Sequence, residues 1–296
     1  MWKKTTPFQS AFPVAVAVFL LLAGGCSTIP KGDRKEAERY LRRGLVLREA
    51  GNFLGAAECF AKAAALDPSY ARAHVELGVE FLRGGVRLED AEKHFRTALK
   101  LDPDLWEARH FLVDTLRCLR KFEQAVQEQE LLVEQRPRWP EGYNNLGDLY
   151  LRLRRFEKAE QAFRRAVSLR ADYGKAWGGL GTALWRRGKI TEGIAALRKA
   201  VGLLPEDVEL RLEIARALIA AGQPELARQE AQTALRLEPD NGVVYHVLAE
   251  AAVAEGKKDE ARAYARQAVI HGCRLTRELR DKLELTAEEL REALRQ

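Results

Sequence analysis

The histidines and cysteines, which carry much of the acid–base and metal chemistry of proteins, are spread along this chain without forming a known site. His110 and Asp114 stand one helical turn apart, as an acid–base pair would, and no larger group of such residues accompanies them. No nucleophile elbow, Walker loop, dinucleotide-binding fingerprint or zinc-binding helix motif is present. The cysteines lack the C-x-x-C or Cys/His spacing of a zinc site, and they are Cys26, Cys59, Cys118 and Cys273. We therefore expect no enzymatic activity, no metal, no cofactor and at most one disulfide.

The charge pattern argues against nucleic acid as a partner. The 296-residue chain has a net charge of +6, of which Lys3 and Lys4 supply two charges, so that residues 26–296 carry +4. Basic and acidic residues are interleaved along this part, without a separate run of Lys or Arg. A chain that is 47% hydrophobic and 31% charged, with only 10 prolines, is typical of long helices. We expect proteins or peptides as partners, and neither nucleic acid nor a small-molecule substrate.

Residues 1–25 have the layout of a secretory signal peptide. Lys3 and Lys4 precede the apolar run 14–22, and the small residues 23–25 follow it. The run is shorter than the roughly 20 residues that a transmembrane helix needs. A buried N-terminal strand or helix is the alternative, but the run is terminal and shows no amphipathic period.

The end of this leader, Leu22 to Cys26, resembles the lipobox of bacterial lipoproteins, in which the cysteine becomes the first residue and carries lipid. One position departs from that pattern, since Ala23 stands where leucine is usual and Leu22 lies one step earlier. The resemblance implies lipid attachment at Cys26 and a place in the bacterial cell envelope. Ser27 favours the periplasmic face of the outer membrane. Residues 26–36 then form a tether of at most roughly 35 Å, which keeps the protein close to the bilayer.

A period of about 34 residues governs the rest of the chain. The same slot near the end of each unit is occupied by Pro68, Pro103, Pro137, Ala171, Pro205, Pro239 and Cys273. One interval is longer by a single residue, which falls in the glycine-rich turn 84–88, where a loop absorbs an insertion at little cost. Such constancy predicts a repeat architecture and disfavours a helical bundle with accidental periodicity.

Each unit repeats one pattern of side chains in two helices. The first helix carries a large residue, then Leu-Gly, then an aromatic residue or leucine, as in residues 143–150. The second helix alternates small, large and small residues on one face, as at Ala159, Phe163 and Ala166. A turn, often with glycine, joins the two helices, and a proline ends the second one.

This pattern resembles the tetratricopeptide repeat. The resemblance implies an all-α fold, a right-handed α-solenoid of helix-turn-helix repeats in which each hairpin covers the apolar face of its neighbour. The units, named repeats 1 to 7 here, are 37–70, 71–105, 106–139, 140–173, 174–207, 208–241 and 242–275. Repeat 3 matches the signature least, because four positions depart from it: Arg109, Val113, Gln129 and Leu132.

The last residues are expected to cap the array. Thr286 and Glu289 have the spacing of a capping box, in which each side chain bonds the backbone N–H of the other residue. A short helix should therefore begin at Thr286, and residues 276–296 are predicted to form the C-terminal capping helix.

In tetratricopeptide proteins the first helices line a concave groove, which usually holds a peptide or a partner helix. Transferring the family's groove positions to repeats 3, 4 and 5 gives candidate partner-binding residues. They are His110, Asp114, Arg117, Asn144, Asn145, Asp148, Arg152, Lys175, Thr182, Trp185 and Arg186. An amide such as that of Asn145 both donates to and accepts from a peptide backbone, and Trp185 is a plausible anchor. The alternative, that Trp185 packs against the next repeat and Asn145 is merely solvated, stays open.

The carboxylate clamp of co-chaperone tetratricopeptide domains is not supported. Asn145 and Lys175 match its residues, but His110, Asp114 and Gly179 do not. Recognition of an acidic C-terminal tail is therefore not expected.

Three functions fit these observations. The first is a membrane-anchored scaffold that binds peptides or folded partners, and lipoproteins of this build include pilotins of type IV pilus secretins and adaptors of cell-wall enzymes. The second is a cell-wall or sugar-modifying enzyme with its site in the groove, for which carboxylates or histidines should converge in one pocket. The third is a structural spacer that associates with itself through its terminal repeats.

Overall fold

A computed structural model describes residues 33–85 and 87–294 of the chain. The predicted signal peptide and the predicted lipid-attachment residue Cys26 lie outside the described residues. The chain divides into two compact units, an N-terminal unit ending at Pro137 and a C-terminal unit beginning at Arg138.

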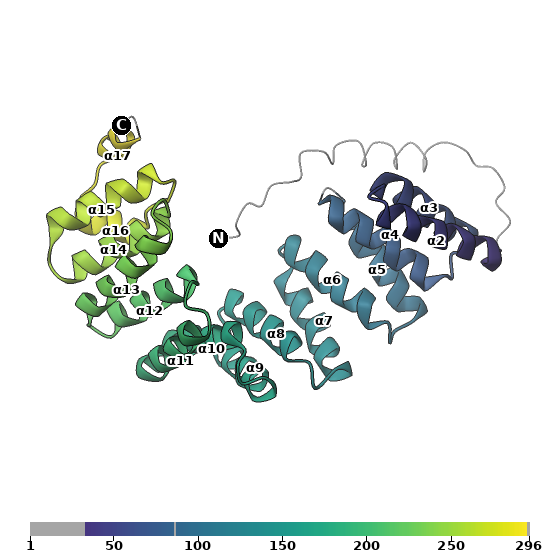
Figure 1. Cartoon of the computed structure of the whole chain (residues 1–296), viewed down its shortest axis with the longest axis horizontal. Helices are drawn as coiled ribbons and strands as arrows, with labels where there is room; N and C mark the ends of the chain where they lie inside the picture. Colours follow the sequence, from purple (N-terminus) through teal and green to yellow (C-terminus); the bar gives the residue numbers. More distant parts are fainter. Residues whose placement is uncertain (1–32, 86, 295–296) are drawn as a thin grey trace. The chain divides into compact units, whose positions relative to one another are not determined.

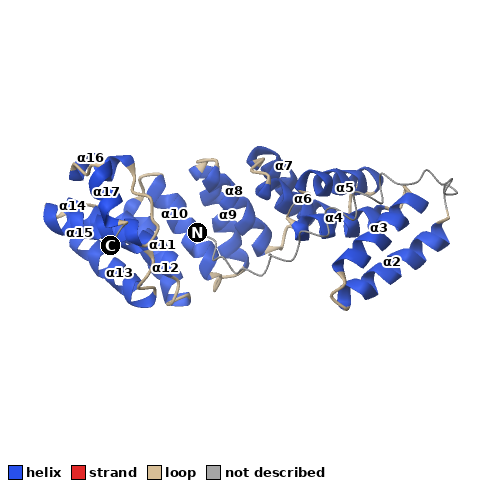
Figure 2. Cartoon of the chain, turned by 90° about the horizontal axis from the view of Figure 1, so that it is seen from above, coloured by secondary structure: helices blue, strands red, loops and turns tan. Residues whose placement is uncertain are grey.

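The prediction of an all-α repeat fold is confirmed, because the described residues form helices that pack in consecutive pairs, with no strand among them (Figures 1 and 2). None of these helices is long and apolar enough to cross a bilayer. The N-terminal unit contains α2 (Arg34–Glu49), α3 (Phe53–Leu66), α4 (Ala71–Gly84), α5 (Leu88–Leu101), α6 (Trp106–Cys118) and α7 (Phe122–Gln135). The paired helices of the C-terminal unit are α8 (Pro140–Arg152), α9 (Phe156–Leu169), α10 (Gly174–Arg186), α11 (Ile190–Leu203), α12 (Val208–Ala220), α13 (Pro224–Leu237), α14 (Gly242–Ala254) and α15 (Lys258–Ile270).

The two ends of the array differ from the predicted boundaries. Residues 34–36, predicted as part of the tether, form the first turn of α2, because the side chain of Asp33 accepts a hydrogen bond from the N–H of Glu36 as its N-cap. Two short helices, α16 (Arg277–Leu283) and α17 (Ala287–Ala293), follow α15 instead of one. Leu279 and Leu283 of α16 are buried, so this helix covers part of the apolar face that the last repeat would otherwise expose.

The predicted capping box is present at the start of α17. The hydroxyl of Thr286 accepts from the N–H of Glu289 at 3.2 Å, and the carboxylate of Glu289 accepts from the N–H of Thr286 at 2.8 Å. The side chain of each residue thus satisfies a backbone donor that the first helical turn leaves unpaired.

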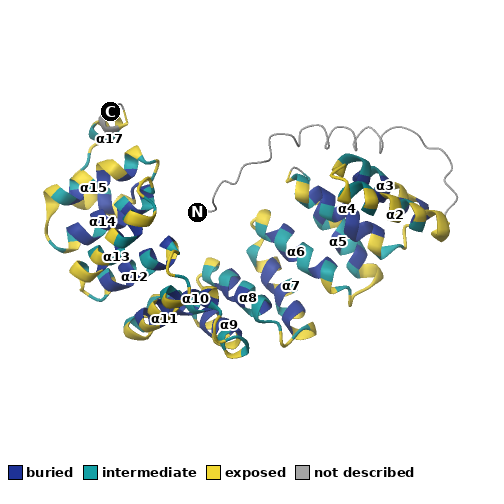
Figure 3. Cartoon of the chain, in the orientation of Figure 1, coloured by how far each residue is buried: buried dark blue, intermediate teal, exposed yellow. Residues whose placement is uncertain are grey.

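Buried residues lie on the helix faces that meet other helices, whereas exposed residues lie on the outer faces and in the turns (Figure 3). In repeat 4 the ring of Phe163 is fully buried and lies where a Cβ on Gly147 would stand, 2.7 Å from the nearest ring atoms. Glycine at this position therefore lets the two helices of a repeat approach, and the ring fills the space between them.

An ion pair replaces an aromatic side chain in repeats 3 and 6. The fourth residue is aromatic in four of the seven repeats, but in repeat 3 it is Arg109. Arg109 is buried, donates to the carbonyl oxygen of Pro103 at 2.8 Å and pairs with Glu128 at 2.6 Å. Arg211 makes the equivalent contacts in repeat 6, with Glu230 at 3.2 Å and with the carbonyl oxygen of Pro205 at 2.9 Å. The other departures in repeat 3 are also buried, so this repeat keeps a filled core.

In repeat 2 the same two positions hold a pair of histidines. The Nδ1 atoms of His74 and His94 lie 3.0 Å apart, and the rings stack with centroids 5.3 Å apart. Nε2 of His74 lies 3.1 Å from the carbonyl oxygen of Pro68. Because a carbonyl only accepts, Nε2 carries the proton of neutral His74, and its Nδ1 accepts from His94.

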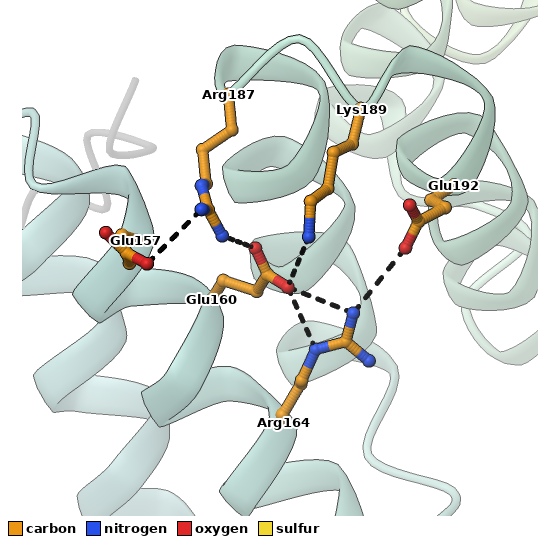
Figure 4. Close-up of polar contacts among 6 residues, drawn as sticks. All are labelled: Glu157, Glu160, Arg164, Arg187, Lys189 and Glu192. Atoms are coloured by element: carbon orange, nitrogen blue, oxygen red, sulfur yellow. Dashed lines mark hydrogen bonds and ion pairs between the residues drawn. The ribbon is translucent and has the colours of Figure 1, made fainter.

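Charged side chains cross the interface between repeats 4 and 5. The buried carboxylate of Glu160 on α9 accepts hydrogen bonds from Arg164 on the same helix and from Arg187 and Lys189 of the next repeat (Figure 4). Burial opposes the ionisation of Glu160, but these three cations outweigh it and hold the pKa of the carboxyl below its ordinary value. The interface therefore depends on one buried charge that three neighbours compensate.

From repeat 1 to repeat 6 the same position alternates between apolar and charged residues. Glu92 of repeat 2 is bound by Arg96 and Lys121 as Glu160 is by its partners. Arg228 of repeat 6 reverses the sign, since it donates to Glu255 at 2.9 Å and to Glu260 at 2.7 Å. In repeats 1, 3 and 5 the equivalent buried residues are Ala57, Val126 and Ile194.

The turns between paired helices place one residue in the left-handed region of backbone space. Glycine occupies this position in five of the repeats, for example Gly188 with φ 88°. In repeats 3 and 4 it is Arg120 with φ 58° and Arg154 with φ 57°. A side chain with a Cβ costs about 1 kcal/mol there, whereas glycine does not.

Replacing Arg154 with glycine should therefore stabilise the C-terminal unit, by roughly 0.5–1 kcal/mol. Urea unfolding of the full chain, followed by circular dichroism, measures this difference. The reciprocal change Gly188→Arg, at the same position of the next repeat, should destabilise by a similar amount. Equal midpoints for wild type and Arg154→Gly would contradict the strain assigned to Arg154.

Candidate partner-binding face

The predicted groove residues divide between the two compact units. His110, Asp114 and Arg117 lie on α6 of the N-terminal unit, and the other eight lie on α8 and α10 of the C-terminal unit. On α6, Asp114 is the centre of a small charge group, 3.8 Å from Nε2 of His110 and 3.1 Å from Nη1 of Arg117. All three side chains are half-buried.

On α8 the two predicted asparagines differ in exposure. Asn144 is buried, and its Nδ2 donates to Asp148 at 3.3 Å, while its Oδ1 makes no hydrogen bond within the described part of the chain. Asn145 is half-buried and Arg152 is exposed. Asn145 is therefore the amide on this helix that a peptide backbone could reach.

On α10 the structure joins Thr182 and Trp185 through a residue that the sequence analysis did not select. The hydroxyl of Thr182 and the indole Nε1 of Trp185 both donate to Oε2 of Glu213 on α12, at 3.3 Å each. Nη1 of Arg216 donates to the other oxygen at 2.8 Å. These contacts fix the Trp185 ring against the next repeat, and the ring also lines a cavity.

That cavity has a volume of about 450 Å³ and lies on the first helices of repeats 5, 6 and 7. Its apolar lining comes from Trp185, Ile219, Val253 and Leu279, and its charged lining includes Arg186, Arg216, Glu250, Glu278 and Lys282. Helix α16 supplies one wall through Glu278, Leu279 and Lys282. A cavity of this size with an apolar base and charged walls is suited to side chains of a bound peptide.

The cavity residues on α12 and α14 stand at the same repeat positions as those predicted on α10. Ile219 and Val253 correspond to Trp185, and Glu250 corresponds to Arg216 and Thr182. The family's groove positions, carried on to repeats 6 and 7, would have selected them. The α16 residues have no such signal, because that helix lies beyond the repeats.

Glu278, one carboxylate of this cavity, is paired with a lysine on its own helix. Nζ of Lys282 donates to Glu278 at 2.7 Å, and this hydrogen bond lowers the pKa of Glu278 below its ordinary value. A general acid needs the opposite shift, as a carboxyl that keeps its proton near neutral pH. Next to the cavity, Cys273 is a free thiol whose pKa burial raises, so it is not an activated nucleophile.

The N-terminal unit has a second cavity, of about 350 Å³, on its own first helices. Its apolar residues are Val75, Val79, Leu105 and Phe111, and arginines and glutamates surround them. The predicted residues His110, Asp114 and Arg117 do not line it. Here Glu76 accepts from Arg48 at 2.7 Å and from Arg72 at 3.2 Å, so the charges are paired within the wall.

Comparison with known proteins agrees with the repeat pattern. The family model described as tetratricopeptide repeat matches residues 41–105, 144–208 and 212–274, and a second model of the same description matches residues 184–236. No curated protein matches the chain.

Solved structures share the fold at low sequence identity. A tetratricopeptide repeat protein from Parabacteroides merdae is 18% identical with a TM-score of 0.67, over 84% of this chain and 98% of that one. YrrB, described as a TPR protein with an unusual peptide-binding site, is 19% identical with a TM-score of 0.54, over 64% and 97%. PilF of Pseudomonas aeruginosa is 20% identical with a TM-score of 0.55, over 76% and 97%.

Proposed function

The chain belongs to the tetratricopeptide repeat family, a family of protein-interaction scaffolds, and from this premise we propose that it is a lipid-anchored adaptor that binds peptide segments of envelope proteins without turnover of its own. The binding site in this proposal is the cavity on α10, α12, α14 and α16. The anchor is Cys26, at the end of the signal-like leader.

The cavity carries the first part of this proposal. Equivalent positions of three successive repeats line it, so that an extended or helical peptide can place side chains at regular steps along it. Trp185, held by Glu213, offers a large apolar surface that loses little side-chain freedom on binding. YrrB, which shares the fold, has a peptide-binding site, and we propose the same kind of ligand here.

The leader supports the second part. A lipid at Cys26 with a tether of at most roughly 25 Å, since α2 begins at Arg34, would hold the adaptor beside membrane-bound partners and raise their effective concentration. Weak individual contacts would then suffice. Pilotins of type IV pilus secretins and adaptors of cell-wall enzymes both match such a protein, and the periplasmic face of the outer membrane is the proposed location.

Replacing Trp185 with alanine should weaken partner binding by about 2 kcal/mol, roughly a 30-fold rise in Kd, because an anchoring aromatic ring is removed from the cavity. The measurement is capture of partners from detergent-solubilised membranes by the full chain, followed by titration of the captured segment as a peptide. Trp177→Ala is the matched control, because Trp177 lies on the same helix and donates to the carbonyl oxygen of Ala171 at 2.8 Å, outside the cavity.

Thermal unfolding of both variants separates lost contacts from lost fold. Recovery of no envelope protein by the wild-type chain would argue against the adaptor. Equal binding by wild type and Trp185→Ala, with Trp177→Ala also unchanged, would place the site elsewhere on the protein.

A further inference from the structure

The turns of repeats 4 and 5 concentrate cations that the sequence as a whole interleaves with acids. Residues 152–155 read Arg-Leu-Arg-Arg and residues 186–189 read Arg-Arg-Gly-Lys, with no acid in either turn. Repeats 6 and 7 differ, since the turn 220–223 has no charge and the turn 254–257 includes Glu255. The positive charge therefore belongs to two consecutive turns of the C-terminal unit.

Hydrogen bonds place these two turns next to each other. Arg187 and Lys189 of the second turn bond Glu160 on α9, and Nη2 of Arg187 lies 3.3 Å from Glu157 (Figure 4). Helix α9 begins at Phe156, directly after the first turn. The cations of both turns thus lie around the same end of α9.

The nearby acids do not neutralise this group. Glu160 is buried and already has three cationic partners. The charged groups of Arg154, Arg155, Lys158 and Arg186 form no ion pair within the described part of the chain. Lys158 lies 5.5 Å from the centroid of the Tyr150 ring and Arg186 lies 4.1 Å from that of Trp185. We name these four residues the basic edge.

One residue of the basic edge occupies a backbone conformation that disfavours it. Arg154 has φ 57° at the position where the neighbouring turn has Gly188. Because glycine would adopt this conformation without strain, an arginine here is a candidate for a role of its side chain. At this position the side chain contributes an exposed cation.

We propose that the basic edge binds the anionic headgroups of a phospholipid bilayer and so sets how the protein lies on the membrane. A bilayer presents its phosphates over a plane, which neighbouring turns can contact together. Single-stranded nucleic acid fits less well, because it needs exposed rings for stacking, and the Tyr150 ring beside Lys158 is buried. The choice of a bilayer over an acidic protein rests on the proposed lipid anchor, which would keep the protein at a membrane surface.

The test is co-sedimentation of the full chain, produced without lipid, with vesicles of phosphatidylcholine alone and with vesicles that also contain phosphatidylglycerol. The apolar leader contributes to binding on both kinds of vesicle. The difference in binding between the two vesicles therefore reports the part of the binding that depends on charge. We expect tighter binding to the anionic vesicles that weakens as salt rises, with about a fivefold contribution from each cation.

The variant Arg154→Glu/Arg155→Glu/Lys158→Glu should lower the partition onto anionic vesicles on the order of a hundredfold and leave phosphatidylcholine binding unchanged. None of these residues lines the cavity. The control Arg198→Glu/Arg236→Glu/Arg266→Glu has the same net charge and changes exposed residues of α11, α13 and α15. We expect the partition of this control onto anionic vesicles to fall only a few-fold, because its net charge is altered.

Equal losses in the two triple variants would overturn the proposal, as would a wild-type chain that does not distinguish the two vesicles. Tighter binding to polyglutamate or duplex DNA than to anionic vesicles would also overturn it and assign the edge to another polyanion. Partner capture through the cavity is measured separately with Trp185→Ala, so a failed vesicle test would leave the adaptor standing, and a failed capture would leave the vesicle result unaffected.

Discussion

Glu160→Arg is expected to destabilise the C-terminal unit by about 3–5 kcal/mol, because it places a fourth cation in a buried position among three others. Arg164, Arg187 and Lys189 all direct their charged groups at the Glu160 carboxylate (Figure 4). Urea unfolding of the full chain, followed by circular dichroism, measures the loss. Glu157→Arg on the same helix is the matched control and should cost no more than about 1 kcal/mol, because Glu157 is exposed.

Repeats 6 and 7 supply the design of a rescue. There, Arg228, Glu255 and Glu260 stand at the positions of Glu160, Arg187 and Glu192, and Gln232 stands at that of Arg164. The triple variant Glu160→Arg/Arg164→Gln/Arg187→Glu copies this arrangement and should recover stability to within about 1 kcal/mol of wild type. If the triple variant is as unstable as Glu160→Arg, other contacts determine which of residues 160 and 187 must be the acid and which the base.

Acid is expected to destabilise the N-terminal unit through the His74–His94 pair. Burial is the main cause that lowers the pKa of both histidines, and it brings that of His94 to about 4, with the neighbouring His74 adding to the effect. The Phe81 ring packs beside His94. Among the charged groups around His94, Asp90 raises the pKa of His94, whereas Lys93 and Arg87 lower it. Asp67 raises the pKa of His74.

The unfolded chain binds protons on these histidines near pH 6.5, before the folded chain does. The stabilisation is therefore complete above pH 6.5 and is lost as the pH falls toward 4, by about 3 kcal/mol for His94. Hydrogen exchange of peptides from α4 and α5, measured across this pH range, follows the loss in the unit that holds the pair.

A matched variant separates the histidines from the carboxylates that also titrate in acid. His74→Arg/His94→Glu introduces the pair found as Arg109 and Glu128 in repeat 3. We expect the stability of this variant to be flat between pH 6.5 and 5. If stability falls with pH equally in wild type and variant, the histidine pair is not the cause of the loss.

Most of the fold could be predicted from sequence because its determinants are local and recur. A glycine that faces a phenylalanine within one hairpin, as Gly147 faces Phe163, returns at a constant interval, and a recurring pattern of small and large residues specifies a helix pair. The capping box of Thr286 and Glu289 was predicted for the same reason, since both partners lie within one turn.

The exceptions in repeat 3 could not be understood from the pattern alone. Arg109 reads as a loss of the expected large apolar residue, but its partner Glu128 lies 19 positions away, in the next helix. Only the structure shows that Arg109 and Glu128 together fill the space of the aromatic side chain. It also shows that the Arg109 guanidinium is hydrogen-bonded there to the carbonyl oxygen of Pro103. Nothing in the repeat signature indicates helix α16 either, because its buried leucines match the exposed end of one particular repeat.

The candidate site was predicted in part. Trp185 and Arg186 line the cavity on α10, whereas His110, Asp114 and Arg117 lie in the other compact unit and line no described cavity. Glu213, which holds Trp185, lies 28 residues further along the chain. The sequence does not show whether a charged residue on a first helix faces solvent or a neighbouring repeat. The contact between Glu213 and Trp185 could therefore be found only in the structure.

The reversal of sign between Glu160 and Arg228 also dictates the order in which the hairpins can follow one another. A chain that lost repeats 5 and 6 in frame would keep its period, yet it would set Glu160 against Glu255 in place of Arg187, while Lys257 and Glu260 would take the positions of Lys189 and Glu192. A hairpin borrowed from a second molecule during folding would meet the same repulsion at any junction that brings like charges together. The buried charges thus favour particular pairs of neighbouring repeats. Apolar interfaces alone would not provide this selectivity, because one apolar face packs on many others.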